Sequence, residues 1–193
     1  MIEVHKRNRL PHWHAQNVAY FVTFNLFDAI PLPVLERLAL ERKLRMAELE
    51  RLKQRATAAE IHGIDRRIRE LAEEALDEGN GSCFMRDLRI AQMIANAIAY
   101  FNGTRYCLQA WCVMPNHVHV VLSANDRLDG IVHSWKSFTA KEANRLLNRD
   151  GKFWQDDYFD RMIRTPQELE RTIRYVLENP MKAGLVDWPF VRA

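Results

Sequence analysis

The chain has 193 residues, of which 48% are hydrophobic and 27% charged, as is ordinary for a single soluble domain with a real core. No apolar run approaches the roughly 20 residues of a membrane-spanning helix, and the first residues lack the apolar stretch of a secretory signal. Three cysteines without CxxC spacing argue against a disulfide framework and a zinc ribbon. We therefore expect a cytoplasmic protein.

The net charge of +3 is only mildly basic, but it is unevenly distributed. Residues 31–78 carry 10 Lys/Arg against 11 Asp/Glu, whereas the rest of the chain carries 18 against 14. The basic excess lies in the part that also holds the chemical motifs described below, as is typical of a protein with a polyanionic partner. A basic solvated surface explains the charge alone equally well.

The first half of the chain predicts a strand followed by two helices. Ala19–Phe27 is short, aromatic and β-branched, which is typical of a buried strand. Val34–Leu76 has a helical composition that is net basic at first and net acidic later, so we expect an antiparallel helical hairpin that turns near residues 56–63. We interpret residues 31–78 as an insertion with a structural or partner-binding role rather than a catalytic one.

The second half predicts alternating helices and strands. In chain order these are a helix over Leu88–Phe101, strands over Tyr106–Val113 and Val118–Leu122, a helix over Ile131–Leu147, a strand over Phe159–Ile163 and a helix that opens at Pro166. The last helix should end near Asn179, because Pro180 disfavours helical geometry in the residue before it. The order predicts a single α+β domain over residues 1–193: a ferredoxin-like antiparallel sheet with helices on one face and an extra C-terminal helix.

The strongest chemical signal is a pair of histidines that follows Pro115-Asn116. Residues two apart in a strand project to the same face, so His117 and His119 point together while the valine between them points away. Two neutral imidazoles side by side can bind a divalent metal ion. The alternative is two surface histidines in an alternating strand.

A second signal lies on the last helix, where Tyr175 and Asn179 are four residues apart and share a face. Tyr175 supplies a phenolic oxygen that can attack phosphorus, and Asn179 supplies a carbonyl oxygen as a possible third metal ligand. Taken alone, the pair also fits a buried aromatic residue and a helix C-cap. Together with His117 and His119 it gives a ligand set without cysteine or carboxylate, which suits Mg²⁺ or Mn²⁺ polarising a phosphodiester.

Four stretches of the chain resemble the REP-associated tyrosine transposases, a group of the single-tyrosine HUH transposases of insertion sequences. They are WCVMPNHVHVVL (Trp111–Leu122), SWKSFTAKEANRLL (Ser134–Leu147), FWQDDYFDRMIR (Phe153–Arg164) and YVLENPMKAGLV (Tyr175–Val186). The N-terminal RLPHWHAQNVAYFVTF (Arg9–Phe24) also looks like the opening strand of that family. The resemblance covers nearly all of the chain outside residues 31–78.

This resemblance implies that His117 and His119 are the paired metal ligands, that Tyr175 is the nucleophile and that Asn179 is the third ligand. In the dimeric insertion-sequence relatives the third ligand is commonly a glutamine, so the amide is kept and the residue differs. The resemblance also implies a hairpin-forming DNA substrate with a short recognition tetranucleotide at its foot.

Further residues are candidates for DNA contacts, each with a surface or core role as its alternative. Phosphates are the expected partners of Lys136, Lys141, Arg145, Arg161 and Arg164. Base stacking is the functional option for Trp154 and Tyr158, which otherwise belong to the core. An N-terminal DNA-contacting arm would include Arg9, His12 and Trp13.

The sequence thus predicts a metal-dependent enzyme that nicks and rejoins single-stranded DNA through a 5′-phosphotyrosine, without ATP or an organic cofactor. One alternative is an inactive module that only binds single-stranded nucleic acid. Another is a metal phosphodiesterase that uses water and leaves no protein–DNA adduct. Insertion-sequence relatives are dimers that exchange the tyrosine helix, whereas the REP-associated group tends to be monomeric, so we expect a monomer with a dimer as the alternative.

Overall fold

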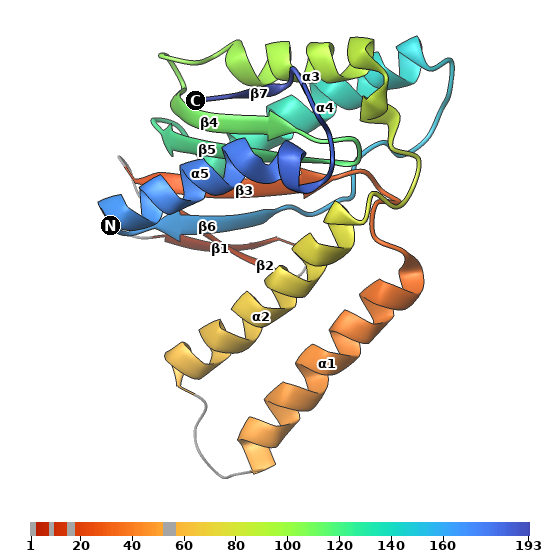
Figure 1. The fold of residues 1–193 in the computed structure, drawn as a ribbon. Coiled ribbons are helices and arrows are strands. Elements are labelled where there is room, and N and C mark those ends of the chain that lie inside the picture. The colour runs from red at the N-terminus through yellow and green to blue at the C-terminus, as the bar shows by residue number, and fades with distance from the viewer. Residues whose placement is uncertain (1–2, 8–9, 15–17, 52–56) are drawn as a thin grey trace.

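The computed structural model describes residues 3–7, 10–14, 18–51 and 57–193. At its centre is a five-stranded antiparallel sheet with the strand order β6-β3-β5-β4-β7 (Figure 1). The strands are β3 Ala19–Asn25, β4 Tyr106–Val113, β5 His117–Ala124, β6 Phe159–Ile163 and β7 Val191–Arg192. Apart from β7, this is the order of a ferredoxin-like sheet, which confirms the predicted fold class.

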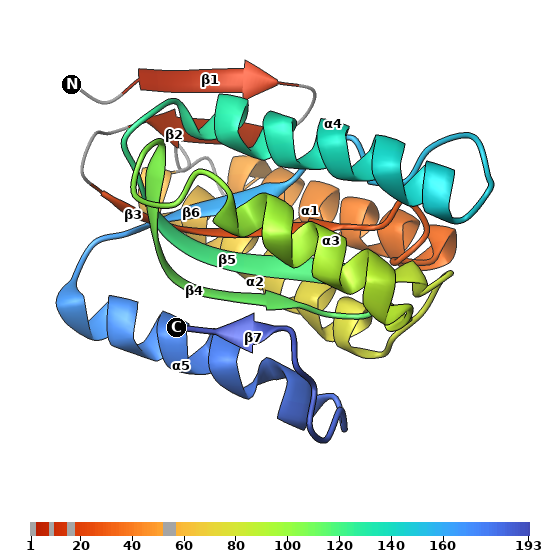
Figure 2. The same ribbon diagram turned by 90° about the horizontal axis from the view of Figure 1, so that it is seen from above.

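Helices cover both faces of the sheet. Figure 2 shows α3 (Leu88–Ala99) and α4 (Leu128–Leu146) on one face and α5 (Pro166–Lys182) on the other. Alternate residues of the strands enter the two cores, as the period of two dictates. On the α3–α4 side these are Tyr20, Val22, Phe24, Val118, Val120 and Leu122; on the α5 side they are Phe21, Ala110, Cys112, Val121 and Ile163.

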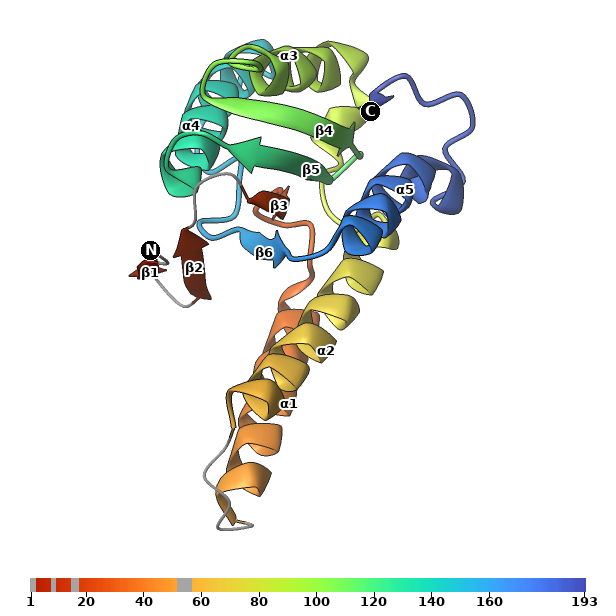
Figure 3. The same ribbon diagram turned by 90° about the vertical axis from the view of Figure 1, so that its left-hand side faces the viewer.

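The predicted helical hairpin is formed by α1 (Leu32–Arg51) and α2 (Ala58–Asp77), which extend away from the sheet (Figure 3). An ion pair of 2.8 Å between Arg42 and Asp65 joins them, in keeping with their complementary charge. The turn was predicted too late in the chain. A capping box between Thr57 and Glu60 starts α2, so that Gly63 lies inside the helix.

The C-terminal end of α2 is fixed against the sheet domain. Ala72, Ala75 and Leu76 are buried in the core that α3 and α4 also enter. The following loop passes so close to Asp28 that a Cβ at Gly81 would lie 2.5 Å from the Asp28 carbonyl oxygen, and Gly81 has a φ of +84°. Only glycine suits that position. The base of the hairpin is therefore held in one place, whereas its outer end projects outward.

Helix α5 is amphipathic and carries two of the predicted site residues. Thr165 caps its start by accepting a hydrogen bond of 3.1 Å from the Glu168 amide, and Pro166 occupies the first turn. The prediction that the helix ends near Asn179 is wrong, because it continues to Lys182 with Pro180 inside it. The missing proline N–H costs one bond close to the end of the helix, and the buried Pro180 packs there instead.

The N-terminal segment adds a feature that the sequence did not predict. Strands β1 (Glu3–Arg7) and β2 (Leu10–His14) pair antiparallel as a separate two-stranded sheet. The following strand, predicted to reach Phe27, ends as β3 at Asn25, and Leu26 forms an isolated bridge to Trp154. Among the described residues, no helix is both long and apolar enough to cross a membrane.

Candidate active site

The two histidines of β5 lie side by side beneath α5, as their spacing predicts. Both are fully buried, and their Nε2 atoms are 3.1 Å apart. The ring of His119 stacks on Phe21 at a centroid distance of 5.3 Å. Pairing of β5 with β3 places Thr23 opposite His119. Strand β3 therefore packs against His119 through Phe21 and Thr23.

Asn116 fixes the tautomer of His117. Its amide nitrogen donates to the carbonyl oxygens of Leu76 and Asn80, both at 3.1 Å, so its oxygen is the atom 2.8 Å from His117 Nδ1. His117 Nδ1 must then be the donor, which leaves a lone pair on Nε2. The same asparagine also ties the end of α2 to the start of β5.

His119 has a more adaptable partner. Its Nδ1 lies 2.8 Å from the hydroxyl of the buried Thr23, which can either donate or accept. When the hydroxyl accepts, Nε2 of His119 is also unprotonated and the two Nε2 lone pairs converge. Burial lowers the pKa of His117 to about 3, and burial together with His117 lowers the pKa of His119 well below its usual range. Both rings are therefore neutral at pH 7.

Tyr175 and Asn179 project from α5 towards the histidines. The Tyr175 ring contacts His119 edge-on, with a centroid distance of 5.5 Å. Asn179 is 1% exposed, yet neither its amide nitrogen nor its oxygen makes a hydrogen bond of ordinary geometry with a described residue. Because a buried unpaired polar atom costs about 1–3 kcal/mol, such an amide beside two histidines indicates a site built for a ligand.

Two carboxylates of α2 approach the same place. Asp77 Oδ1 lies 3.8 Å from His117 Nε2, and burial raises the pKa of Asp77 against the opposing effect of Asn179 and Lys182. Burial and the charge of Asp77 raise the pKa of Glu73 to about 7. Burial, with the charges of Glu73 and Asp77, also raises the pKa of Tyr175. The phenol is therefore fully protonated at neutral pH.

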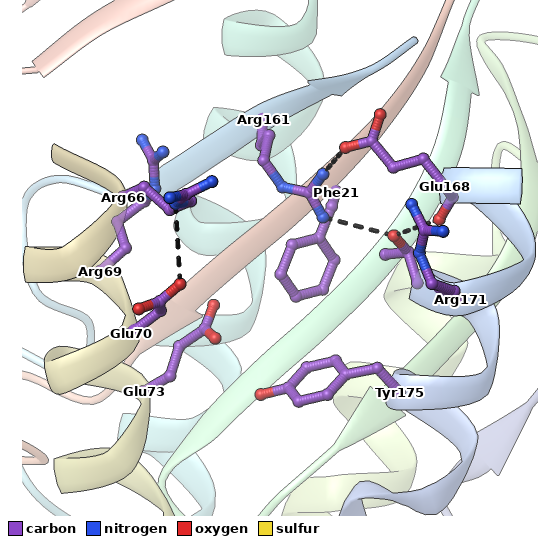
Figure 4. Close-up of a pocket in the computed structure, with 10 residues that line it drawn as sticks. Phe21, Arg66, Arg69, Glu70, Glu73, Arg161, Glu168, Arg171 and Tyr175 are labelled. Atoms are coloured by element: carbon purple, nitrogen blue, oxygen red, sulfur yellow. Dashed lines mark hydrogen bonds and ion pairs between the residues drawn. The ribbon is translucent and has the colours of Figure 1, made fainter. Parts of the chain in front are cut away.

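A cavity of about 420 Å³ opens beside Tyr175 (Figure 4). Helix α2 forms one wall and α5 the other, while β3 and β6 form the base. Its charged lining residues are Arg66, Arg69, Glu70, Glu73, Arg161, Glu168 and Arg171. Four guanidinium groups against three carboxyl groups make it suited to an anion of phosphate type.

Some of the candidate DNA-binding residues lie elsewhere. The Lys136 ammonium donates to the carbonyl oxygens of residues 155, 156 and 157 at 2.7, 2.9 and 3.1 Å, so it holds that loop. Trp154 is 4% exposed, and its indole donates to Thr139. Tyr158 is 8% exposed and packs in the same core. The structure thus gives these three residues packing or loop-holding positions.

The other candidates divide between the cavity and the surface. Arg161 of β6 lines the cavity, pairs with Glu168 and donates to Thr172 at 3.3 Å. Exposed positions are those of Lys141, Arg145 and Arg164, and Arg145 pairs with Glu142 at 3.0 Å. Arg9 and the side chains of His12 and Trp13 lie outside the described part of the chain.

Several residues of the site were not identified from the sequence. Asn116 immediately precedes β5, and Thr23 lies in the neighbouring strand β3. The available signal was that Asn116 is next to His117 in the sequence. The α2 residues Arg66, Arg69, Glu73 and Asp77 gave none, because they are four charges in a charged amphipathic helix. Only the folded position of the hairpin brings them to the histidines.

Comparison with known proteins found one family model and related transposases. Residues 86–179 match the family described as "Transposase IS200 like", and this segment includes both histidines, Tyr175 and Asn179 but not α2. The chain is 26% identical over 104 residues to the REP-associated tyrosine transposase of Escherichia coli K12, which is 51% of this chain and 62% of that protein. The match thus spans less than two thirds of the relative's length.

A solved structure has the same fold over nearly the whole chain. It is a REP-associated tyrosine transposase bound to a REP hairpin, with a TM-score of 0.54 and 14% sequence identity, covering 96% of this chain and 82% of that one. At this identity the likeness concerns the fold alone. The family match at residues 86–179 and the E. coli relative thus make the chain similar to the IS200-like transposases and, among curated proteins, to the REP-associated tyrosine transposases.

Proposed function

We propose that this protein cuts single-stranded DNA by attack of Tyr175 on phosphorus and later rejoins it, as a transposase or DNA strand transferase. The observation that carries the proposal is the packing of Tyr175 against His119, with ring centroids 5.5 Å apart, beside two converging imidazole nitrogens. A phenolic nucleophile next to a metal-type ligand set suits phosphoryl transfer.

The residues at the site fit a divalent cation of the kind that the family uses. Two adjacent ligands of an octahedral ion with bonds of about 2.1 Å lie roughly 3.0 Å apart, and the two Nε2 atoms are 3.1 Å apart. The unpaired oxygen of Asn179 supplies a third donor. We assign His117, His119 and Asn179 as ligands of Mg²⁺ or Mn²⁺, which would polarise the scissile phosphate and stabilise charge on the leaving oxygen.

The guanidinium groups of the cavity have the position to hold the DNA backbone next to the nucleophile. Arg66 and Arg69 reach it from α2, and Arg161 and Arg171 from β6 and α5. Arginine forms bidentate hydrogen bonds with phosphate, which fixes orientation as well as charge. Contacts of this kind would hold the scissile phosphate beside the Tyr175 oxygen, where proximity accelerates attack.

The reaction conserves the number of phosphodiester bonds. The Tyr175 oxygen loses its proton and bonds to phosphorus, while the bond from phosphorus to the 3′ oxygen breaks and that oxygen leaves as a 3′-hydroxyl. A 5′-phosphotyrosine remains. In rejoining, a 3′-hydroxyl attacks the same phosphorus, the bond to Tyr175 breaks and the phenol regains a proton. Neither ATP nor an organic cofactor is needed.

We further propose that the substrate is hairpin-forming repeat DNA. The solved structure of similar fold is described as bound to a REP hairpin, which supports this substrate class. Further backbone contacts outside the cavity would come from the exposed basic residues Lys141, Arg145 and Arg164. Arg9, His12 and Trp13 stay candidates for DNA contacts on the strength of the sequence.

We also propose that one copy of the chain is sufficient for activity. The nucleophile and both histidines meet within the same chain, because α5 packs on its own sheet through Val176 and Ile173. A monomer therefore holds a complete site. We interpret the chain as one domain in which α1 and α2 are an insertion. The C-terminal half of α2 reaches the site.

The test is cleavage of hairpin oligonucleotides taken from the DNA that flanks the gene, in the presence of Mn²⁺ and read on a denaturing gel. Wild-type protein should give a shortened strand and a slow band that protease removes. Tyr175→Phe deletes one oxygen, so it should bind DNA normally but form no adduct. Tyr158→Phe is the matched control, because Tyr158 is packed in the core and should leave the adduct intact.

Three results would contradict the proposal in different ways. Cleavage without any adduct favours a phosphodiesterase that uses water. An adduct that persists in Tyr175→Phe moves the nucleophile to another residue. Binding without cleavage under all divalent ions favours an inactive nucleic-acid-binding module.

A further inference from the structure

Attack by Tyr175 requires a partner that removes its proton. The phenol lies in a mostly buried position between α5 and α2, where two carboxyl groups disfavour its anion. A tyrosine hydroxyl is a weak nucleophile while it keeps its proton, so the proton has to leave as the bond to phosphorus forms. A general base within reach of the hydroxyl performs this task in many enzymes.

We propose that Glu73 of α2 accepts the proton of Tyr175, so that the helical hairpin supplies a catalytic residue. This inference rests on the proposed function. Figure 4 shows the Tyr175 hydroxyl pointing across the cavity towards α2, where the Glu73 side chain extends to meet it. The hydroxyl makes no hydrogen bond of ordinary geometry with a described residue. Glu73 and Asn179 are the two side chains that act on it as hydrogen-bonding groups, and of these only the Glu73 carboxylate can take up a proton.

The other carboxylates near the cavity are occupied or turned elsewhere. Glu168 pairs with Arg161 and accepts the amide of Arg164 at 2.9 Å. Glu70 lies between Arg66 and Arg67, at 3.9 and 3.6 Å. Both carboxylates are therefore engaged by arginine side chains.

Asp77 is not a wall of the cavity. Its carboxylate lies on the histidine side of α2, 3.8 Å from His117. Glu73, one turn earlier on the same helix, is the carboxylate that shares the cavity with Tyr175.

The charges around Glu73 tune it to this role. Asp77 faces it from the same helix and, with burial, raises its pKa, while Arg69 of α2 and Arg161 of β6 oppose that effect. The resulting pKa of about 7 is the value at which a general base is both available and effective near neutral pH. A glutamate at the ordinary pKa of 4.5 would be a much weaker base.

The proton balance is closed in both directions. During nicking, the proton of the Tyr175 hydroxyl passes to the Glu73 carboxylate and the oxygen bonds to phosphorus. The bond from phosphorus to the 3′ oxygen breaks, and that oxygen takes a proton from water. During rejoining, a 3′-hydroxyl gives its proton to water and displaces the tyrosine oxygen, and the Glu73 carboxylic acid returns a proton to that oxygen. One residue therefore serves as base in the first step and acid in the second, as reversibility requires.

The experiment measures adduct formation in a single turnover, with hairpin DNA and Mg²⁺ both saturating. Glu73→Gln should lower the rate by about 10²- to 10⁴-fold, with DNA affinity and Mn²⁺ affinity changed less than about twofold. Glu74→Gln is the matched control, since its exposed side chain on the same helix does not line the cavity, and it should react at the wild-type rate. A Glu73→Gln rate within threefold of wild type, in a variant that still forms the adduct, overturns the inference.

A second measurement uses the wild-type protein and is independent of any variant's folding. From pH 5.5 to 8.5 the adduct rate should rise about tenfold per unit and level off above a pKa near 7, because only the carboxylate form of Glu73 accepts a proton. A flat profile contradicts the assignment, as does an inflection that disappears in Asp77→Asn but not in Glu73→Gln. Failure of the proposed function is a separate result, because wild-type protein would then form no adduct on Tyr175 at any pH.

Discussion

The sheet with α5 and the α1–α2 hairpin meet at one cavity but are built in opposite ways. The sheet is buried on both faces, and the two histidines and Asn179 are almost fully enclosed. The hairpin is buried only at its base, and Leu40 and Leu44 on α1 are 55% and 61% exposed. The first region holds two imidazoles, an amide and a phenol in a fixed geometry, whereas the second brings charged groups to them.

This difference separates two requirements of phosphoryl transfer. Metal ligands and a nucleophile need positions that vary little, which strands and a packed helix provide. Groups that bind phosphate or carry protons need charge, which is costly inside a sheet core but tolerable on a half-exposed helix. Asn116 links the two regions, because it contacts His117 and the last turn of α2 together.

Removal of a histidine should have the largest effect. His119→Ala deletes one of two converging ligands, so metal-dependent cleavage should fall by more than about 100-fold, and Mn²⁺ binding by calorimetry should be lost in parallel. DNA affinity should fall much less, because backbone contacts supply most of it. Full cleavage by the His117, His119 double alanine variant would rule out the metal assignment.

Shortening the hairpin tests whether nicking depends on its outer end or on its base. Replacing residues 45–62 by a short Gly/Ser linker keeps Arg66, Arg69 and Glu73, so nicking should stay within about threefold of wild type, since loop-closure costs vary slowly with length. Replacing all of residues 34–77 should lower nicking by at least about 100-fold, because the base is lost. Equal activity of the two folded deletions would show that the hairpin is dispensable for the chemistry.

Asn116 connects the two regions through its hydrogen bonds, so a single substitution there tests the connection. Asn116→Ala removes the hydrogen bonds to His117 and to the carbonyl oxygens of Leu76 and Asn80. Metal affinity should fall about 10- to 100-fold, as is usual when the partner of a ligating histidine is lost. Calorimetry with Mn²⁺ measures this, and unchanged affinity would show that Asn116 does not orient His117.

The smallest expected effect is a gain in stability. The pKa of Glu73 is about 7 in the folded protein, above its ordinary value of 4.5, so the free energy of unfolding decreases as pH rises between these values. Glutamine does not ionise, so the stability of Glu73→Gln should not decrease in this way as the pH rises. The variant should therefore be more stable than wild type above pH 7, by up to about 3 kcal/mol, and show little gain at pH 4.5. Thermal unfolding at the two pH values checks this; an equal gain at both would indicate a cause other than ionisation.

Local patterns account for the part of the site that the sequence could predict. The spacing of His117 and His119 follows from the period of a strand, and that of Tyr175 and Asn179 from the turn of a helix. The order of elements predicted the sheet, and β4 and β6 have the predicted bounds. These predictions depend only on residues that are close together in the sequence.

The contributions of α2 could not be predicted in this way. Glu73 is separated from Tyr175 by about half of the chain, and nothing in its own helix distinguishes it from Glu70 or Glu74. Its role depends on where the base of the hairpin rests, which is set by buried Leu76 and by the close approach of Gly81 to Asp28. Helix α5 passed its expected end for a similar reason, because tertiary packing outweighs the local preference of Pro180.

The most direct test of the account is the identity of the amino acid that becomes linked to DNA. Wild-type protein is incubated with hairpin DNA and a divalent cation, the adduct is digested with protease and nuclease, and the peptide is sequenced by mass spectrometry. We expect a nucleotide joined through a 5′-phosphate to Tyr175. A nucleotide on Tyr158 or any other residue, or cleaved DNA with no modified peptide, would contradict it.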